Sequence, residues 1–258
     1  MKKYLLDLKV VANERLAPNF ALLKLQGDEP LPDMLPGQFA EIRVDNAPNT
    51  FLRRPISINF VDRQQNSIWF LIQLVGEGTK RLATLELGAI VNVLLPLGNG
   101  FAMPLRPAEK LLLVGGGAGI APMLFFGKQL MMEDIRPAFL LGARTASMLL
   151  QLNEFSKYGD VYTTTEDGSH GEKGFVTQHS ILRSQHFDRI YCCGPKPMMV
   201  SVAKYAKANG ITCEVSLENK MACGLGACLC CVENTTSGNV CVCKEGPVFN
   251  INDLLWQI

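Results

Sequence analysis

Short apolar runs separated by turn residues dominate the first hundred residues of the chain. Such runs occupy residues 20–25, 38–44 and 68–75, and glycine, proline, asparagine and aspartate lie between them. Runs of this length at this spacing are typical of the strands of a small β-barrel. We therefore expect an all-β part over residues 1–104, opening with a strand near the N-terminus.

After residue 104 the pattern changes to alternating strands and helices. Residues 110–114 form a continuous apolar run, which indicates a strand buried on both faces of a parallel sheet. A glycine-rich stretch follows, and the sequence then predicts a helix over residues 123–132 with Pro122 in its first turn. Further strands are expected at residues 138–142, 160–165 and 189–193. We therefore predict an α/β part over residues 105–215.

The turn after the first strand of the α/β part has the composition of a phosphate-binding loop. Its glycines are Gly115, Gly116, Gly117 and Gly119. They let the backbone approach a ligand closely, and the dipole of the following helix favours a pyrophosphate. The pattern differs from G-x-G-x-x-G, so this turn alone is a weak signal.

Other strand ends of the α/β part offer further binding residues. Cys193, Gly194 and Pro195 end the run at 189–193, and ligands of open α/β sheets bind at such ends. The Cys193 thiol itself is interpreted as a small buried group. Glu166 and Asp167 end another strand and either bind a ribose hydroxyl or belong to a solvated loop. Arg144 is a candidate for meeting a 2′-phosphate.

Two stretches of the barrel contain candidate ligand-binding residues. Arg53 and Arg54 enter the apolar strand that continues through Pro55 and Ile56 to Ser57. Either both arginines lie on a solvated strand end, or Arg54 meets a pyrophosphate while Ser57 and the nearby backbone hydrogen-bond a flat ring. The turn at residues 76–80 includes Gly78 and Thr79 and precedes a short helix. It is either an ordinary loop or a helix N-terminus offered to a phosphate.

Charge and length exclude several classes of function. The chain has 258 residues, enough for two ordinary domains, and 25 basic side chains nearly balance 24 acidic ones. The chain therefore lacks the excess of positive charge that binding to nucleic acid or an anionic membrane favours, so neither partner is expected. No apolar run is long enough to span a bilayer. The three histidines are scattered, so we expect no catalytic triad.

The cysteine spacing near the C-terminus is the most specific motif. Cys223, Cys228 and Cys231 read C-x4-C-x2-C and a fourth cysteine follows about a dozen residues later, the plant-type spacing for a [2Fe–2S] cluster. We take Cys243 as the fourth ligand because Gly246 and Pro247 can hold a turn after it. Sequence geometry alone leaves Cys230 and Cys241 open as replacements.

Two other uses of these cysteines compete with the cluster. Zinc sites usually combine two close cysteine pairs, which this spacing matches poorly. Disulfides need an oxidising compartment, whereas Asp7 and Lys9 interrupt the N-terminal apolar stretch that an export signal requires. Nine cysteines without an export signal indicate the reducing cytoplasm.

Taken together, the motifs resemble the ferredoxin–NADP reductase superfamily in order and spacing. The matching stretches are residues 54–57, 76–79, 115–122 and 193–195. The cysteine segment, with Cys-Lys-Glu-Gly-Pro-Val-Phe at residues 243–249, is similar to the family of electron-transfer subunits of type B dihydroorotate dehydrogenases. This similarity covers essentially the whole chain.

The resemblance implies a fold and a set of ligands. It implies a six-stranded antiparallel barrel for FAD over residues 1–104, a parallel-sheet domain for NAD over 105–215 and a [2Fe–2S] segment over 216–258. The implied flavin-lining residues are Arg54, Pro55, Ile56, Ser57, Ile72, Gln73, Leu74, Gly78 and Thr79. The implied cluster ligands are Cys223, Cys228, Cys231 and Cys243.

The resemblance also implies a partner. In that family the subunit pairs with an FMN-containing catalytic subunit as a heterotetramer with two copies of each. Electrons then pass from dihydroorotate through FMN, the cluster and FAD to NAD+, and orotate enters pyrimidine biosynthesis. No residue here is a candidate for deprotonating dihydroorotate, so we expect that step on the partner. The apolar tail at 248–256 is a candidate contact with it.

Two other functions remain open. One is a related flavin and iron–sulfur subunit of a ferredoxin:NADP or sulfide-linked oxidoreductase. The other is a zinc-stabilised scaffold protein without redox turnover.

Overall fold

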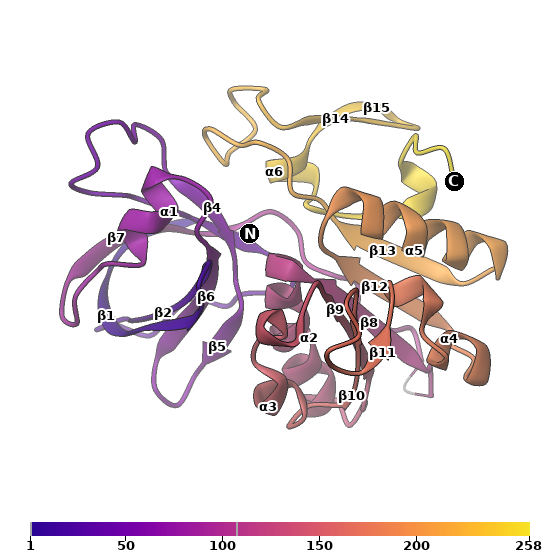
Figure 1. Ribbon diagram of the computed structural model, residues 1–258. Coiled ribbons are helices and arrows are strands. Elements are labelled where there is room, and N and C mark those ends of the chain that lie inside the picture. The colour runs from indigo at the N-terminus through magenta and orange to yellow at the C-terminus, as the bar shows by residue number, and fades with distance from the viewer. Residues whose placement is uncertain (1, 107) are drawn as a thin grey trace.

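Seven strands of the N-terminal part form one curled antiparallel sheet, drawn in indigo to magenta in Figure 1. The computed structural model describes residues 2–106 and 108–258. The sheet order is β4-β3-β7-β1-β2-β6-β5, and helix α1 (Glu77–Leu82) follows β6. The strands are β1 (Tyr4–Ala17), β2 (Phe20–Gln26), β3 (Phe39–Ile42), β4 (Arg54–Ser57), β5 (Phe60–Asp62), β6 (Ser67–Gln73) and β7 (Ile90–Leu97).

The barrel expectation is confirmed in class and differs in strand number. Seven strands occur where six were expected, because the three-residue strand β5 extends the sheet beyond β6. Leu23, Leu25, Phe70 and Val93 lie completely buried inside the curl, as alternating apolar residues of its strands. Closing an apolar face inward in this way removes most of the sheet's hydrophobic surface from water.

The second part is a sheet of order β11-β10-β9-β8-β12-β13-β16, parallel except for β16. Two predicted strands, 160–165 and 189–193, have the expected bounds. The predicted helix begins two residues early, at Ala121, after a 3₁₀ turn at Gly117–Ile120. Its strands are β8 (Leu111–Gly116), β9 (Ala138–Ala143), β10 (Asp160–Thr165), β11 (Glu172–Lys173), β12 (Arg189–Cys193), β13 (Thr212–Ser216) and β16 (Val248–Asn250).

Helices cover both faces of this sheet (Figure 1). Leu111 and Leu113 of β8 belong to one buried cluster with helix α2 (Ala121–Met132), whereas Leu112 and Val114 belong to another with helix α5 (Lys196–Ala208). Successive strand side chains point to opposite faces, so a strand buried on both sides must be apolar throughout. The shorter helices are α3 (Leu152–Phe155) and α4 (Ile181–Ser184). No helix within the described ranges is long and apolar enough to cross a membrane.

The C-terminal part is joined to both of the others. It contains the hairpin β14 (Val232–Thr235) and β15 (Gly238–Cys241), helix α6 (Val242–Glu245) and strand β16. Strand β16 pairs with β13 of the parallel sheet, and Phe249 and Leu254 are buried there. The hypothesis that the whole apolar tail meets a partner is therefore wrong for these two residues. Their side chains pack within the chain, and Leu255 remains exposed.

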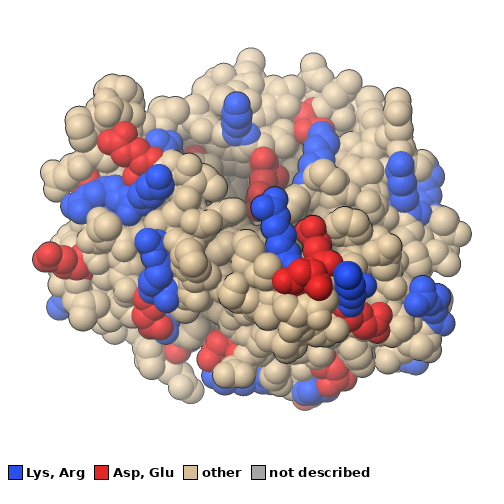
Figure 2. Space-filling view, viewed as in Figure 1, with Lys and Arg blue, Asp and Glu red and all other residues tan. Residues whose placement is uncertain are grey.

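Direct contacts fix the barrel against the parallel sheet. The Asn59 amide donates to the Ala121 carbonyl at 3.2 Å and accepts a hydrogen bond from Gln151 at 3.0 Å. Lys128 of α2 donates to the Val61 carbonyl at 2.7 Å. On the surface, basic and acidic side chains are interspersed, and the face in Figure 2 is hollowed between the two parts. The barrel therefore presents a fixed surface to the ends of the parallel strands.

Replacing Phe249 by alanine should loosen the C-terminal part from the sheet. Truncating a buried phenylalanine typically costs about 3–5 kcal/mol through lost burial and a cavity. We expect a clear fall in the thermal unfolding temperature measured by circular dichroism. Leu255→Ala is the matched control, because Leu255 is 55% exposed and its loss should leave that temperature nearly unchanged. Equal effects of the two substitutions would contradict the role of β16.

Candidate functional site

Four cysteines of the C-terminal part form two pairs. Cys223 lies beside Cys228, and Cys243 lies beside Cys231, whose Sγ atom accepts a hydrogen bond from the Cys243 amide at 3.4 Å. Cys231 and Cys243 are 2% and 1% exposed, whereas Cys228 lies at the surface. Two adjacent thiol pairs suit a binuclear centre, in which each of two irons takes two protein thiolates.

The loop between the first two cysteines directs amide groups at sulfur atoms. The Leu225 N–H donates to Cys223 Sγ at 3.3 Å, and the Gly226 N–H donates to Cys243 Sγ at 3.1 Å. Gly224 and Gly226 have φ values of +66° and +81°, which glycine adopts without strain and which turn the loop around the sulfurs. Hydrogen bonds of this kind stabilise negative charge on sulfur.

The pKa values of Cys223 and Cys243 are shifted in opposite directions. Burial raises the pKa of Cys223, but hydrogen bonds from the amides of Leu225 and Cys228 outweigh it and lower the pKa to about 6. Burial and the neighbouring Cys231 raise the pKa of Cys243 to about 12. A buried thiol of this kind becomes a thiolate when a metal replaces its proton.

The other two cysteines of the segment lie outside the pairs. Cys230 is exposed. Cys241 faces the loop, where its thiol donates to the Gly226 carbonyl at 3.8 Å and its amide donates to Glu245 at 2.9 Å. No three His, Cys, Asp or Glu side chains of the described residues converge as they would around a single metal ion. Two separate pairs are the arrangement that the segment offers.

In the barrel, the predicted arginine stretch forms the half-buried edge strand β4. The two arginines differ in surroundings, which the sequence did not reveal. Arg53 donates to the carbonyls of Glu41 and Asn92 and so ties neighbouring strands together. Arg54 lies against Gly78, where an added Cβ would be only 2.6 Å from its Nε atom. The structure thus brings Arg54 and the 76–79 turn together.

The remaining predicted barrel residues have distinct surroundings. The Thr79 hydroxyl accepts hydrogen bonds from Val75 and Gly76 and therefore holds the turn itself. Ile72 points into the barrel core, so only its backbone is available to a ligand. Gln73 is exposed and lines the cavity between barrel and sheet, and the Leu74 amide donates to Asn19 at 2.8 Å.

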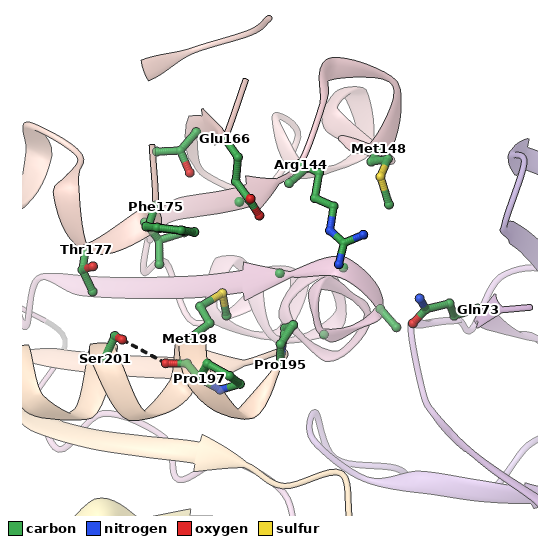
Figure 3. Close-up of a pocket in the computed structure, with 18 of the residues that line it drawn as sticks. Gln73, Arg144, Met148, Glu166, Phe175, Thr177, Pro195, Pro197, Met198 and Ser201 are labelled. Atoms are coloured by element: carbon green, nitrogen blue, oxygen red, sulfur yellow. Dashed lines mark hydrogen bonds between the residues drawn. The ribbon is translucent and has the colours of Figure 1, made fainter. Parts of the chain in front are cut away.

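A cavity of about 630 Å³ lies where the parallel strands end (Figure 3). Gln73 of the barrel borders it at one end, and Phe175 and Thr177 border it at the other. Of the predicted glycine-turn and 193–195 residues, Gly116, Gly117, Gly119 and Pro195 line it. Gly115 is buried beside Ile120, and Gly194 borders a smaller neighbouring cavity.

The close approach of two turns explains Gly119. A Cβ atom on this residue would lie 2.4 Å from the carbonyl carbon and oxygen of Cys193. The Cys193 thiol faces the core, and burial raises its pKa well above the ordinary range. Its backbone therefore shapes the site while its sulfur takes no part.

Glu166 and Arg144 both line the cavity, from neighbouring strand ends (Figure 3). Asp167 does not, because its carboxylate accepts hydrogen bonds from the amide and hydroxyl of Ser169, which lower its pKa. Glu166 is thus the better placed of the two predicted ribose ligands.

Sequence reasoning missed several cavity residues. Ser201 and Met198 lie in the first turns of α5, directly after the predicted turn at 193–195, so the rule of strand-end binding could have found them. Phe175 follows an irregular loop and carries no periodic signal, yet it is 61% exposed beside the cavity.

Glu41 of β3 was also missed. Its side chain is completely buried, and neither carboxyl oxygen has a hydrogen-bond partner. Burial raises the pKa of Glu41 to about 7, partly offset by Arg53. A Cβ atom on Gly224 would lie 2.8 Å from Glu41 Cγ, so this carboxyl group touches the cysteine loop.

Comparison with known proteins places similarity along nearly the whole chain. The family model "Iron-sulfur cluster binding domain of dihydroorotate dehydrogenase B" matches residues 218–255, and "Oxidoreductase NAD-binding domain" matches residues 113–204. The protein named "Dihydroorotate dehydrogenase B (NAD(+)), electron transfer subunit" from Lysinibacillus sphaericus is 40% identical, covering 94% of this chain and 95% of that protein. Its namesake from Fusobacterium nucleatum is 36% identical, covering 96% and 97%.

Solved structures agree on the fold. A chain from the structure "Insights into flavin-based electron bifurcation via the NADH-dependent reduced ferredoxin-NADP oxidoreductase structure" is 27% identical with a TM-score of 0.87, covering 96% of this chain and 90% of that one. The structure "Ferredoxin reductase in carbazole 1,9a-dioxygenase" has a TM-score of 0.69 at 23% identity, covering 82% and 67%.

Adding a methyl group at Gly119 should disrupt the nucleotide cavity. The Cys193 backbone cannot give way as a flexible side chain would, so Gly119→Ala must separate the two turns. We expect at least a tenfold loss of NADH affinity in a fluorescence titration. Gly76→Ala is the control, because nothing lies within 4 Å of its added Cβ. Unchanged affinity in the Gly119 variant would contradict the assignment of this cavity.

Proposed function

The chain belongs to the family of electron-transfer subunits of dihydroorotate dehydrogenase B, and on that premise we propose that it carries electrons from a catalytic subunit to NAD+. The carriers within the chain are a [2Fe–2S] cluster and FAD. The four clustered cysteines, whose sulfurs accept hydrogen bonds from the amides of Leu225, Gly226 and Cys243, are the observation on which this proposal depends. Residues 1–104, 105–215 and 216–258 are proposed to hold FAD, NAD and the cluster.

The donor set fits a [2Fe–2S] cluster. The proposed ligands are Cys223, Cys228, Cys231 and Cys243. Loop amides already point at their sulfurs, as a negatively charged cluster requires. Cys241 lies near the loop but is tied to Gly226 and Glu245, and Cys230 is at the surface. A cluster supplies one-electron transfer when bound.

The barrel residues fit a flavin between the cluster and the nucleotide. Arg54 beside Gly78 provides a guanidinium group for a pyrophosphate, and the half-buried strand through Ser57 provides backbone for a flat ring. The proposed set also includes Pro55, Ile56, Ile72, Gln73, Leu74 and Thr79. A flavin exchanges single electrons with a cluster and hydride with a nicotinamide.

The cavity at the ends of the parallel strands is proposed to bind NAD. Its glycine turn, with Gly115, Gly116, Gly117 and Gly119, leaves room for the pyrophosphate beside Cys193, Gly194 and Pro195. Gln73 of β6 lies at the barrel end of this cavity, so a nicotinamide held at that end would face the barrel. Glu166 is placed to accept hydrogen bonds from a ribose.

The proposed partner is an FMN-containing catalytic subunit, in a heterotetramer with two copies of each chain. The exposed residues Leu225 and Leu229 flank Cys228 and offer apolar contacts at the outer thiol pair. Oxidation of dihydroorotate itself is proposed to take place on this partner. We place the complex in the cytoplasm, a reducing compartment in which cysteines remain available as cluster ligands.

One alternative has a specific observation in its favour. The TM-score of 0.87 to a chain of an NADH-dependent reduced ferredoxin-NADP oxidoreductase structure supports a related flavin and iron–sulfur subunit with another electron donor. The higher identity of the dihydroorotate dehydrogenase relatives favours the main proposal.

Anaerobic turnover of the copurified complex tests the function. We expect dihydroorotate to drive NADH formation, measured by absorbance, and the reaction to stop when this chain is omitted. A complex that is reduced by NADH but gives no turnover with dihydroorotate would move the assignment to the alternative.

Serine substitutions test the fourth ligand. Cys243→Ser should abolish the visible absorbance and EPR signal of the cluster, because it removes half of the inner pair. Cys241→Ser should keep both, and Cys230→Ser serves as the surface control. Loss of the cluster in the Cys241 variant with retention in the Cys243 variant would reverse the assignment.

A further inference from the structure

Glu41 is a buried acid without a role in the function described so far. It is 0% exposed, and both of its carboxyl oxygens lack a hydrogen-bond partner. An unsatisfied buried carboxyl group is costly, and most such groups in native proteins have a partner. The surroundings of Glu41 therefore indicate which partner completes the site.

The neighbours of Glu41 leave one direction open. On its own sheet, β3 pairs with β4 at Pro55 and with β7 at Leu94. On the other side, its Cγ and Oε1 atoms lie against Gly224, next to the Leu97 side chain. Gly224 directly follows Cys223. The carboxyl group thus lies against the proposed cluster loop, on the strand that pairs with β4.

The nearby arginines do not supply the missing hydrogen bonds. Arg53 directs its N–H groups at the backbone carbonyl of Glu41 and at Asn92. Arg54 donates to the Arg53 carbonyl. A carboxyl group that is completely buried without a hydrogen bond is far less costly as the neutral acid than as the carboxylate. A cluster with four thiolates would add negative charge and favour the neutral acid further.

A neutral carboxyl group is a hydrogen-bond donor, and the cysteine loop offers sulfur acceptors. We propose that Glu41 is a positioning residue for the cluster, donating a hydrogen bond from its carboxyl group to a sulfur atom on the Cys223 side. This role rests on the proposed [2Fe–2S] function. A hydrogen bond to sulfur stabilises the more negative, reduced cluster and thereby raises its reduction potential.

Redox titration of the complete complex, followed by cluster EPR at pH 6, tests the proposal. Glu41→Leu removes the donor and should lower the midpoint potential. Glu41→Gln keeps an N–H donor and should restore a potential close to that of the wild type. Leu97→Met is the matched control, because Leu97 packs against the same loop without a polar atom, and its potential should be unchanged.

Several outcomes would overturn this role. A rise in potential in both Glu41 variants would mean that the group is a charged carboxylate. An unshifted midpoint potential in both Glu41 variants, or an equal shift in Leu97→Met, would mean that Glu41 contributes packing and no hydrogen bond. A wild-type complex without any [2Fe–2S] signal would overturn the proposed function as well, so the two failures are distinguishable.

A second measurement does not depend on the leucine variant taking up a cluster. Proton ENDOR of the reduced wild type should contain an exchangeable coupling, lost in D₂O, that changes when Glu41→Gln replaces O–H by N–H. The loop amides are the same in both proteins, so their couplings serve as the internal reference. Identical exchangeable couplings in the two proteins would refute the hydrogen bond.

Discussion

Residues 245–250 hydrogen-bond to the barrel on one side and to the parallel sheet on the other. The Asn99 amides of the barrel turn donate to the carbonyls of Gly246 at 2.6 Å and Glu245 at 2.8 Å. The Leu217 amide donates to the Pro247 carbonyl at 2.9 Å, beside the β13–β16 ladder. These hydrogen bonds hold the segment that follows the cysteine loop to the barrel turn and to the parallel sheet at once.

The two thiol pairs of the C-terminal part differ in their exposure to solvent. The outer pair lies beside exposed leucines, and the inner pair is buried against α6 and the barrel. Glu41 and Arg54 then follow on the barrel side, and Gln73 leads to the nucleotide cavity. The barrel therefore contacts the cysteine loop through Glu41 and borders the nucleotide cavity through Gln73.

The sequence predicted the elements whose pattern is local. Strands 160–165 and 189–193 matched because continuous apolar runs bounded by turns specify buried parallel strands. Strand β16 was missed because three residues are too few to show a strand's alternating pattern. Its pairing with β13 is a contact between distant segments that the local sequence does not reveal. The cysteine spacing predicted a cluster segment, but the pairing of its thiols and the differing surroundings of Arg53 and Arg54 required coordinates. Glu41 could not be foreseen, because a glutamate in a strand normally faces water, whereas here the cysteine loop covers the outer face of β3.

The pairing of β16 with β13 bears on whether the cluster segment is a separate module of the fold. A C-terminal cluster segment might be regarded as an accessory that a reductase gains or loses as a unit. Here its removal would expose the β13 edge, whose unpaired amides and carbonyls favour association with other chains. It would also remove the partners of Asn99 at the barrel turn. A version of this fold without the segment therefore has to protect the edge of β13 in another way, and a chimera that exchanges the segment together with the nucleotide sheet keeps this pairing.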